Sequence, residues 1–141
     1  MSVGLDTSVT LRLLTGTPAD QAEAARALVA TATTPVVVSD LVISETYLAL
    51  RHHYGVPHAD AVRALGQLLR ETRIRPSGTA RGVLAELGER AGAKRAPDLI
   101  GRLIHADYAR DDVTVATFDR DLARLSGALL LQARTELFKN A

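Results

Sequence analysis

Two apolar runs, one near each end of the chain, both stop on a carboxylate. The first covers residues 3–5 and is followed by Asp6, and the second covers residues 113–118 and is followed by Asp119. Such runs are typical of short buried strands, and open parallel sheets place their chemistry at the carboxyl ends of the strands. If these two strands are neighbours in one sheet, Asp6 and Asp119 face the same crevice. Because clustered carboxylates repel one another without a cation, that arrangement predicts a divalent metal.

Composition limits the class of protein. A chain of 141 residues is long enough for one domain with a complete core, and we expect a single domain over residues 1–141. Lys and Arg total 17 against 16 for Asp and Glu, so the net charge predicts no particular partner. The lack of cysteine excludes disulfides, thiolate catalysis and Cys-ligated zinc. Neither a signal peptide nor an apolar stretch of the ~20 residues that a membrane span needs is present, so we expect a cytoplasmic protein that binds no membrane.

Strands alternate with amphipathic helices along the sequence. The expected strands cover residues 3–6, 35–38, 73–75, 113–117 and 128–131. The expected helices cover residues 7–14, 22–32, 41–54, 58–71, 79–91 and 97–109, with helical turns at 122–125 and at the C-terminus. We expect Thr7 or Ser8 to cap the first helix and Ser39 or Asp40 to cap the third. This alternation predicts an α/β fold with a mostly parallel central sheet flanked by helices.

Asp6, Glu45 and Asp119 are the main candidate site residues. Asp6 also precedes a helix, so capping is its alternative role. Glu45 lies inside the apolar run 41–48, and we expect it to face a buried or half-buried surface, where an unpaired carboxylate is costly. The alternatives for Glu45 are an exposed stripe or an arginine partner such as Arg51. We expect Asp121 to be a solvated cap for the turn that follows it.

Asp98 is the candidate for a further acid. It follows a proline at the start of an expected helix, so N-capping competes with a role as a ligand. On the face of the helix that begins at Asp98, Gly101 and His105 follow. A cluster of three or four acids is the arrangement that Mg²⁺- or Mn²⁺-assisted hydrolysis of a phosphodiester needs, because hard cations prefer oxygen ligands.

Other catalytic classes have less support. The adjacent His52 and His53 fall on different faces of a helix and the HExxH spacing is absent, so a zinc site is disfavoured. The nucleotide-binding motifs GxxxxGK[ST] and GxGxxG are also absent. A phosphatase-like hydrolase on a generic α/β sheet has no nucleophile motif to support it.

Four segments resemble a known family, at residues 5–8, 39–45, 102–109 and 117–121. In order and spacing they resemble the PIN-domain ribonucleases, particularly the VapC-type toxins of bacterial toxin–antitoxin pairs, over essentially the whole chain. The resemblance implies that Asp6, Glu45 and Asp119 are the first, second and fourth acids of the family. It also identifies Thr117 as the hydroxyl residue that often accompanies the last acid.

The third acidic position departs from that family pattern. Relatives with an Arg-Leu-Ile-His-Ala-Asp-Tyr-like helix usually carry Asp immediately before the Arg, where this chain has Gly101. Asp98 lies one helical turn earlier, about 4.5 Å along the axis. Either Asp98 substitutes for the missing acid or the site holds its metal weakly. Gly inside a helix costs about 1 kcal/mol relative to Ala, so helix stability does not explain Gly101.

The resemblance therefore implies an Mg²⁺- or Mn²⁺-dependent endoribonuclease that acts as a toxin and is neutralised by an antitoxin protein. Asp6, Asp98 and Asp119 are the expected metal ligands, with Glu45 as a ligand or as a base beside the metal. Because of Gly101, the alternative is a catalytically inactive PIN-like binding module.

Two kinds of partner are expected beyond the antitoxin. Basic side chains would attract the RNA substrate, and the candidates are Arg51, Lys94, Arg95, Arg102, Arg120 and Arg124. A homodimer is implied by the resemblance. It is also favoured because the helices at 58–71 and 79–91 carry more apolar residues than a short sheet is expected to cover.

Overall fold

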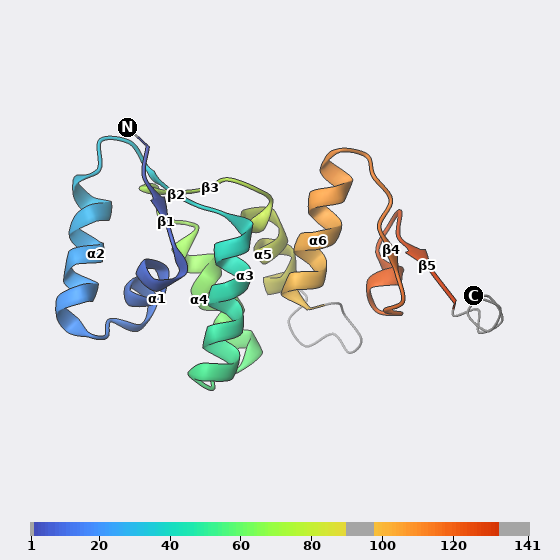
Figure 1. Cartoon of the computed structure of the whole chain (residues 1–141), viewed down its shortest axis with the longest axis horizontal. Coiled ribbons are helices and arrows are strands. Elements are labelled where there is room, and N and C mark those ends of the chain that lie inside the picture. The colour runs from blue at the N-terminus through green and yellow to red at the C-terminus, as the bar shows by residue number, and fades with distance from the viewer. Residues whose placement is uncertain (1, 90–97, 133–141) are drawn as a thin grey trace, which may run out of the picture. The chain divides into compact units, whose positions relative to one another are not determined.

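Helices and short parallel strands alternate along the chain, which confirms the predicted α/β fold class. The computed structural model describes residues 2–89 and 98–132. The chain divides into an N-terminal unit, Met1–Ala93, and a C-terminal unit, Lys94–Ala141. The N-terminal unit contains β1 (Gly4–Leu5), α1 (Thr7–Thr15), α2 (Ala19–Thr31), β2 (Val36–Val38), α3 (Asp40–Leu48), the π-helical turn η1 (Ala49–His53), α4 (His58–Leu68), β3 (Ile74–Pro76) and α5 (Ala80–Glu89) (Figure 1). The C-terminal unit contains α6 (Leu99–Arg110), β4 (Ala116–Thr117), the 3-10 turn η2 (Leu122–Arg124) and β5 (Leu129–Leu130).

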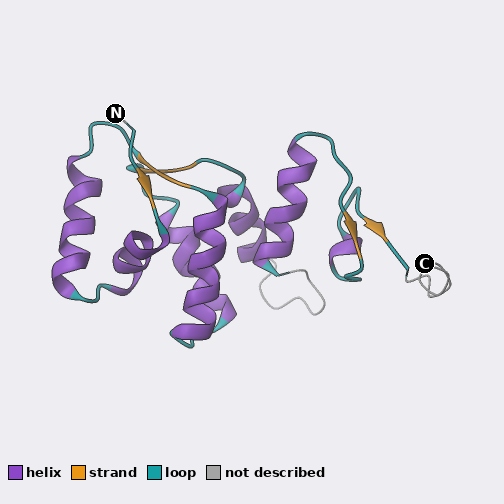
Figure 2. Ribbon diagram, viewed as in Figure 1, coloured by secondary structure: helices purple, strands orange, loops and turns teal. Residues whose placement is uncertain are grey.

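The sheet of the N-terminal unit has β2 between β1 and β3, with both pairings parallel. Helices connect the successive strands, as parallel pairing requires, and they make up most of this unit (Figure 2). The side chains of Val36 and Val38, which share one face of β2, are fully buried, whereas Val37 on the opposite face is half-buried. The predicted edge strand at 73–75 is confirmed as β3, shifted by one residue.

The cap of α1 differs from the prediction. Asp6, rather than Thr7 or Ser8, occupies the N-cap position with extended backbone, and its side chain accepts a hydrogen bond from the Val9 amide. A carboxylate competes well for this position because it also faces the positive end of the helix dipole. At the other end, α1 stops at Gly16, whose φ of 72° is left-handed.

Two caps at the end of β2 hold α3 and α5. Ser39 caps α3 as predicted, since its side chain accepts from the Val42 amide. The Asp40 carboxylate instead reaches α5, where it accepts hydrogen bonds from the amides of Thr79 (3.1 Å) and Ala80 (3.2 Å). Asp40 thereby fixes the start of α5 to the start of α3.

The apolar faces of α4 and α5 are already covered. On α4 the buried side chains include Val62 and Leu65, and on α5 they include Val83 and Leu87. The expectation that these helices leave apolar surface uncovered is therefore wrong for their described residues. The apolar side chains that the N-terminal unit exposes lie elsewhere, and they include Leu41, which is 77% exposed, and Leu48 on α3.

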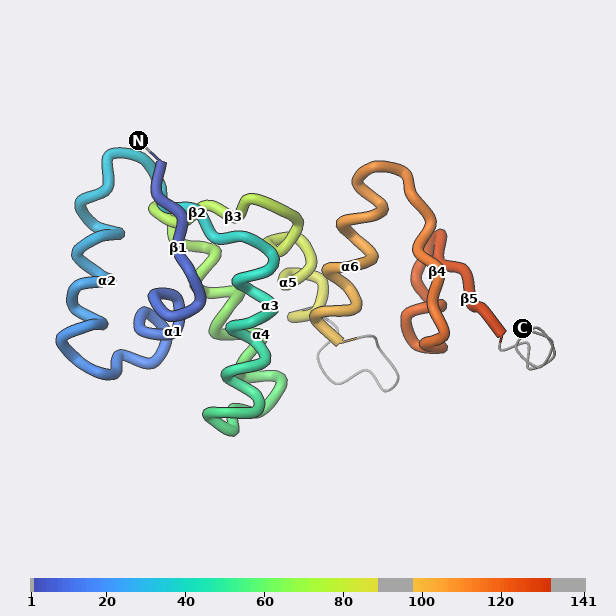
Figure 3. The backbone as a smooth tube through the Cα atoms, viewed as in Figure 1, coloured from blue at the N-terminus to red at the C-terminus, as the bar shows by residue number. Residues whose placement is uncertain are grey.

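The C-terminal unit pairs β4 with β5 in parallel, and the turn η2 lies between them in sequence (Figure 3). The strand expected at 113–117 is shorter than predicted and begins at Ala116. β1 and β4 each pair with another strand of their own unit. The prediction that β1 and β4 lie side by side in one sheet therefore stays a prediction. The predicted C-terminal helical turn lies outside the described residues. So do the last residues of the helix expected at 79–91 and the first residue of the helix expected at 97–109. In the described parts of the chain, every helix is too short or too polar to cross a membrane.

Candidate active site

Asp6 stands at the carboxyl end of β1, where it is both the N-cap of α1 and an exposed carboxylate. Its Oδ1 accepts from the Ser8 hydroxyl at 2.6 Å and from the Val9 amide at 3.1 Å. These two hydrogen bonds, chiefly the one from Ser8, lower the pKa of Asp6 below its ordinary value of 3.8. Asp6 is therefore ionised at neutral pH, and the Ser8 hydroxyl and the Val9 amide both donate to the same oxygen, Oδ1.

Glu45 is exposed, which corrects the prediction that it faces a buried or half-buried surface. The buried face of α3 is formed by Ile43, Thr46 and Tyr47, and Glu45 lies on the other side of the helix with the exposed Leu41 and Leu48. The apolar run 41–48 therefore led to the wrong prediction for Glu45, because the run covers both the buried and the solvent-facing sides of α3.

The partner of Glu45 is the Thr7 hydroxyl, which donates to Oε2 at 3.1 Å. Arg51 is not that partner, because its guanidinium donates to the Val56 carbonyl oxygen at 3.1 Å. Thr7 immediately follows Asp6, so this contact brings the Glu45 carboxylate next to the residue that ends β1. The contact joins Glu45 to the residue that follows Asp6, and the convergence of the two acids on one site stays a prediction.

Asp119 follows β4 and organises the turn after it. Its amide donates to the Thr117 hydroxyl at 2.9 Å, and its Oδ1 accepts from the amides of Asp121 (2.8 Å) and Leu122 (3.5 Å). Asp121 occupies the N-cap position of η2 as predicted, but its side chain makes no capping hydrogen bond there, and the carboxylate that accepts from the turn is that of Asp119. Within the described residues, Oδ2 of Asp119 accepts no hydrogen bond.

Asp98 and Gly101 meet at the start of α6. Asp98 is the N-cap, and its Oδ1 accepts from the Gly101 amide at 2.8 Å. Asp98 therefore caps α6 with one oxygen, Oδ1. Its other oxygen, Oδ2, accepts no hydrogen bond within the described part of the chain. Gly101 contributes only its backbone to this contact. His105, one turn further along, is bonded through Nε2 to the Ser126 carbonyl oxygen.

The donor chemistry of these acids fits a hard cation. Each of the four acidic side chains uses one oxygen for a local contact and leaves the other open, and open carboxylate oxygens are the ligands that Mg²⁺ prefers. Across residues 2–89 and 98–132, however, no three acidic or histidine side chains are grouped as a metal site. The described residues therefore offer the ligand types but not an assembled cluster, and the convergence of Asp119 with Asp6 and Glu45 stays a prediction.

The basic side chains differ in their availability. Arg102 is only 6% exposed, and Arg51 is bound to a backbone carbonyl, whereas Arg120 and Arg124 are exposed. Lys94 and Arg95 lie outside the described residues. Exposure favours Arg120 and Arg124 as the arginines that reach a phosphate.

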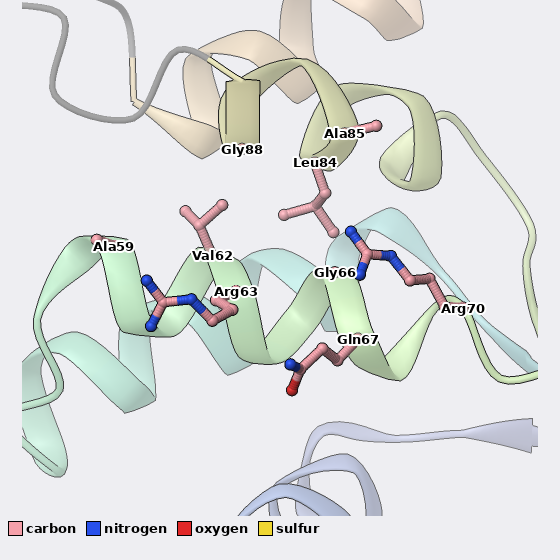
Figure 4. A pocket seen from close by; sticks show the side chains of 9 residues that line it. All are labelled: Ala59, Val62, Arg63, Gly66, Gln67, Arg70, Leu84, Ala85 and Gly88. Carbon is pink, nitrogen blue, oxygen red and sulfur yellow. The ribbon is translucent and has the colours of Figure 1, made fainter.

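A cavity in the N-terminal unit is lined by residues of α4 and α5 and by the residues next to these helices. It has a volume of about 530 Å³ between α4 and α5, and Figure 4 shows Arg63 of α4, Arg70 just after α4 and Leu84 of α5 among the side chains that line it. None of its lining residues is one of the candidate acids. The four candidate carboxylates are instead exposed.

Two positioning contacts had no counterpart in the sequence predictions. The donation from Thr7 to Glu45 and the reach of Asp40 to α5 both join residues about forty positions apart. The only signal for the first was the pair of hydroxyl residues directly after Asp6. For Asp40 the sequence indicated a cap, but on the wrong helix.

Together the fold and these residues define an α/β protein with carboxylates at the carboxyl ends of parallel strands. The family model of the PIN domain matches residues 3–128, so the chain belongs to the PIN domain family. PIN domains are typically nucleases, and they generally use divalent metal ions. No curated protein matches the chain.

Proposed function

We propose that this protein is an Mg²⁺- or Mn²⁺-dependent endoribonuclease, the toxin component of a cytoplasmic toxin–antitoxin pair. The observation that carries the proposal is the contact of Glu45 with Thr7, the residue after Asp6. This contact holds the Glu45 carboxylate against the residue after Asp6, at the end of β1, in a chain whose family is typically nucleolytic. The VapC-like order of the four sequence segments supports the toxin role.

Asp6, Asp98 and Asp119 would hold the cation through the oxygens that their local contacts leave open. When bound, a divalent cation of this kind stabilises negative charge developing on a phosphodiester and lowers the pKa of water. Asp6 contributes a charge that its hydrogen bonds from Ser8 and Val9 keep ionised. Glu45 is held by Thr7 through one oxygen, so its other oxygen is available as a ligand or as the base that accepts a proton from water.

The second candidate function is a catalytically inactive PIN-like module that binds partners only. Gly101 is the observation that favours it, because this residue offers a backbone amide where relatives of this type carry a carboxylate. An inactive module would bind its partner equally well with and without a divalent metal. An active nuclease loses cleavage when the metal is removed.

The antitoxin and the homodimer are proposals that rest on the family resemblance. The described apolar side chains of α4 and α5 are buried, so these helices give the dimer no support of their own. Light scattering at micromolar concentration tests it. A species of twice the 15.1 kDa chain mass supports a dimer, and a species of 15.1 kDa contradicts it.

The function is tested by incubating the full chain with a structured RNA in Mg²⁺, in Mn²⁺ and in EDTA. We expect metal-dependent cleavage that Asp6→Asn abolishes, because Asn keeps the helix cap but loses the charge. Asp20→Asn is the matched control, since Asp20 is an exposed acid whose side chain bonds only to the neighbouring Gln21 amide among the described residues. Cleavage that persists in EDTA, or that survives Asp6→Asn, contradicts the proposal. Binding of RNA without cleavage in any metal supports the inactive module.

A further inference from the structure

Phe118 is a large aromatic side chain that stays 69% exposed directly beside a candidate acid. It stands between Thr117 and Asp119. The apolar side chains that this unit buries include Val115 and Leu122, on either side of Phe118 in the sequence. Because burying an aromatic ring is a major source of stability, a ring left in solvent forgoes that gain. The exposure therefore points to a contact made from outside the unit.

The backbone around Phe118 is fixed by hydrogen bonds. The Asp119 amide donates to the Thr117 hydroxyl, and the Leu131 amide donates to the Thr117 carbonyl oxygen at 2.8 Å. On the other side, the Asp121 amide donates to Asp119 Oδ1 at 2.8 Å. The ring is thus presented from a held turn, which reduces the entropy lost when it stacks on a ligand.

Arginine side chains follow the ring closely. Arg120 and Arg124 are both exposed, and neither forms an ion pair or a side-chain hydrogen bond with any described residue. An exposed aromatic ring beside unpaired guanidinium groups is the combination that single-stranded nucleic acid uses, because bases stack on the ring and phosphates bind the cations. A duplex is a poorer fit, since its bases are already stacked on one another.

We propose that Phe118 stacks on an unpaired base of the RNA substrate, next to the phosphodiester that Asp119 addresses, while Arg120 and Arg124 bind neighbouring phosphates. This inference rests on the proposed function, which supplies RNA as the substrate. It assigns Phe118 as the residue that selects single-stranded over double-stranded RNA. Every base presents a π-face, so the selection is for unpaired structure and not for one sequence.

Binding of a short, labelled single-stranded RNA to the full chain in EDTA tests this assignment without requiring catalysis. Loss of one base stack is expected to raise the Kd of Phe118→Ala about 5- to 150-fold. Phe118→Tyr keeps an aromatic face and is expected to bind as the natural protein does. Tyr108→Ala is the matched control, because Tyr108 is another exposed aromatic of the same unit, 47% exposed on α6. Its loss is expected to leave the Kd unchanged.

The salt dependence separates stacking from charge. Phe118→Ala is expected to keep the slope of log K against log salt, whereas Arg120→Ala is expected to lower its magnitude by about 0.7, the value for one phosphate contact on a single strand. The penalty of Phe118→Ala is also expected to disappear on an RNA strand that lacks its bases. If Phe118→Ala binds RNA as tightly as the natural protein does, the assignment of Phe118 is overturned and the proposed function is not. That result includes the case in which the ring contacts a protein partner. If the natural protein neither binds the RNA in EDTA nor cleaves RNA in Mg²⁺ or Mn²⁺, the proposed function is overturned together with it.

Discussion

The Thr7 hydroxyl donates a hydrogen bond to Glu45 Oε2 at 3.1 Å, and this contact links the residue after the first candidate acid to the helix that carries the second. It joins α1 to α3 across the carboxyl end of β1. One oxygen of Glu45 is thereby oriented, and the other is free for chemistry. The contact makes Thr7 a positioning residue for the proposed site.

Thr7→Val is expected to lower the rate of RNA cleavage about 2- to 10-fold, because a hydrogen bond of this kind contributes about 0.5–1.5 kcal/mol. The loss should appear in kcat at saturating Mg²⁺, since Glu45 keeps its charge but loses its orientation. Thr31→Val is the control, because among the residues that the structure describes the Thr31 hydroxyl bonds only to the Ala27 carbonyl oxygen of its own helix. Equal rates for Thr7→Val and the natural protein contradict a positioning role for Thr7.

Gly78→Ala is expected to destabilise the protein by about 1–3 kcal/mol in urea denaturation. A Cβ at this position would lie 2.6 Å from Cγ and 2.7 Å from Oδ1 of Asp40. That carboxylate cannot move freely, because it caps α5. Gly82→Ala, inside α5 itself, is the control: its Cβ would meet nothing within 4 Å, so we expect a gain of about 0.5–1 kcal/mol.

Asp40→Ala is expected to cost about 0.5–2 kcal/mol through the loss of the α5 cap. In that background, Gly78→Ala should cost much less than it does alone, because the carboxylate that it meets is gone. A double-mutant cycle by urea denaturation measures this coupling. Additive costs would show that Asp40 and Gly78 do not constrain each other.

Ser8→Ala is expected to raise the pKa of Asp6 toward 3.8, since the Ser8 hydroxyl is the main cause of its depression. A carboxyl group whose folded pKa is depressed contributes stability above its unfolded pKa and loses it as the pH falls through the folded pKa. Asp6→Asn should therefore show less acid destabilisation below about pH 4 than the natural protein. NMR titration of the carboxyl carbon in EDTA gives the pKa, and an unchanged value in Ser8→Ala would refute the stated cause.

Gly101→Asp is expected to tighten Mg²⁺ binding and to raise RNA cleavage, because it adds a carboxylate on the helix face of Asp98. Asp98→Asn is the comparison, since Asn retains the cap of α6 while it removes the charge. Metal titration and cleavage of bulk RNA measure both effects. If Gly101→Asp changes neither quantity while Asp98→Asn abolishes both, Asp98 is the third acid and position 101 is not.

Local sequence patterns predicted the elements well because each rests on nearby residues. The alternation of apolar runs predicted the strands at β2 and β3 and the helices between them within a few residues. The strand-terminal position of Asp6 was likewise visible in the sequence. Position 101 stood out because the residues after it match a family segment that usually begins with an acid.

Contacts between distant residues were beyond that reasoning. The apolar run around Glu45 indicated burial, but which side of α3 faces the core is set by packing against other elements. The cap of α5 comes from Asp40 on another helix, and only the folded chain brings the two together. The exposure of Phe118 was also not foreseen, because an apolar residue at a strand end is as compatible with the core as with solvent.

Paramagnetic broadening by Mn²⁺ tests the central claim most directly, since a single ion at a shared site must affect all of its ligands. NMR spectra of the full chain are recorded during titration with Mn²⁺ below one equivalent. We expect the resonances of the proposed ligands Asp6, Asp98 and Asp119 to broaden together with that of Glu45, and to recover together when Mg²⁺ is added in excess. Broadening of Asp6 and Glu45 that leaves Asp119 sharp, or no site-specific broadening at all, would contradict a metal-dependent nuclease site built from these acids.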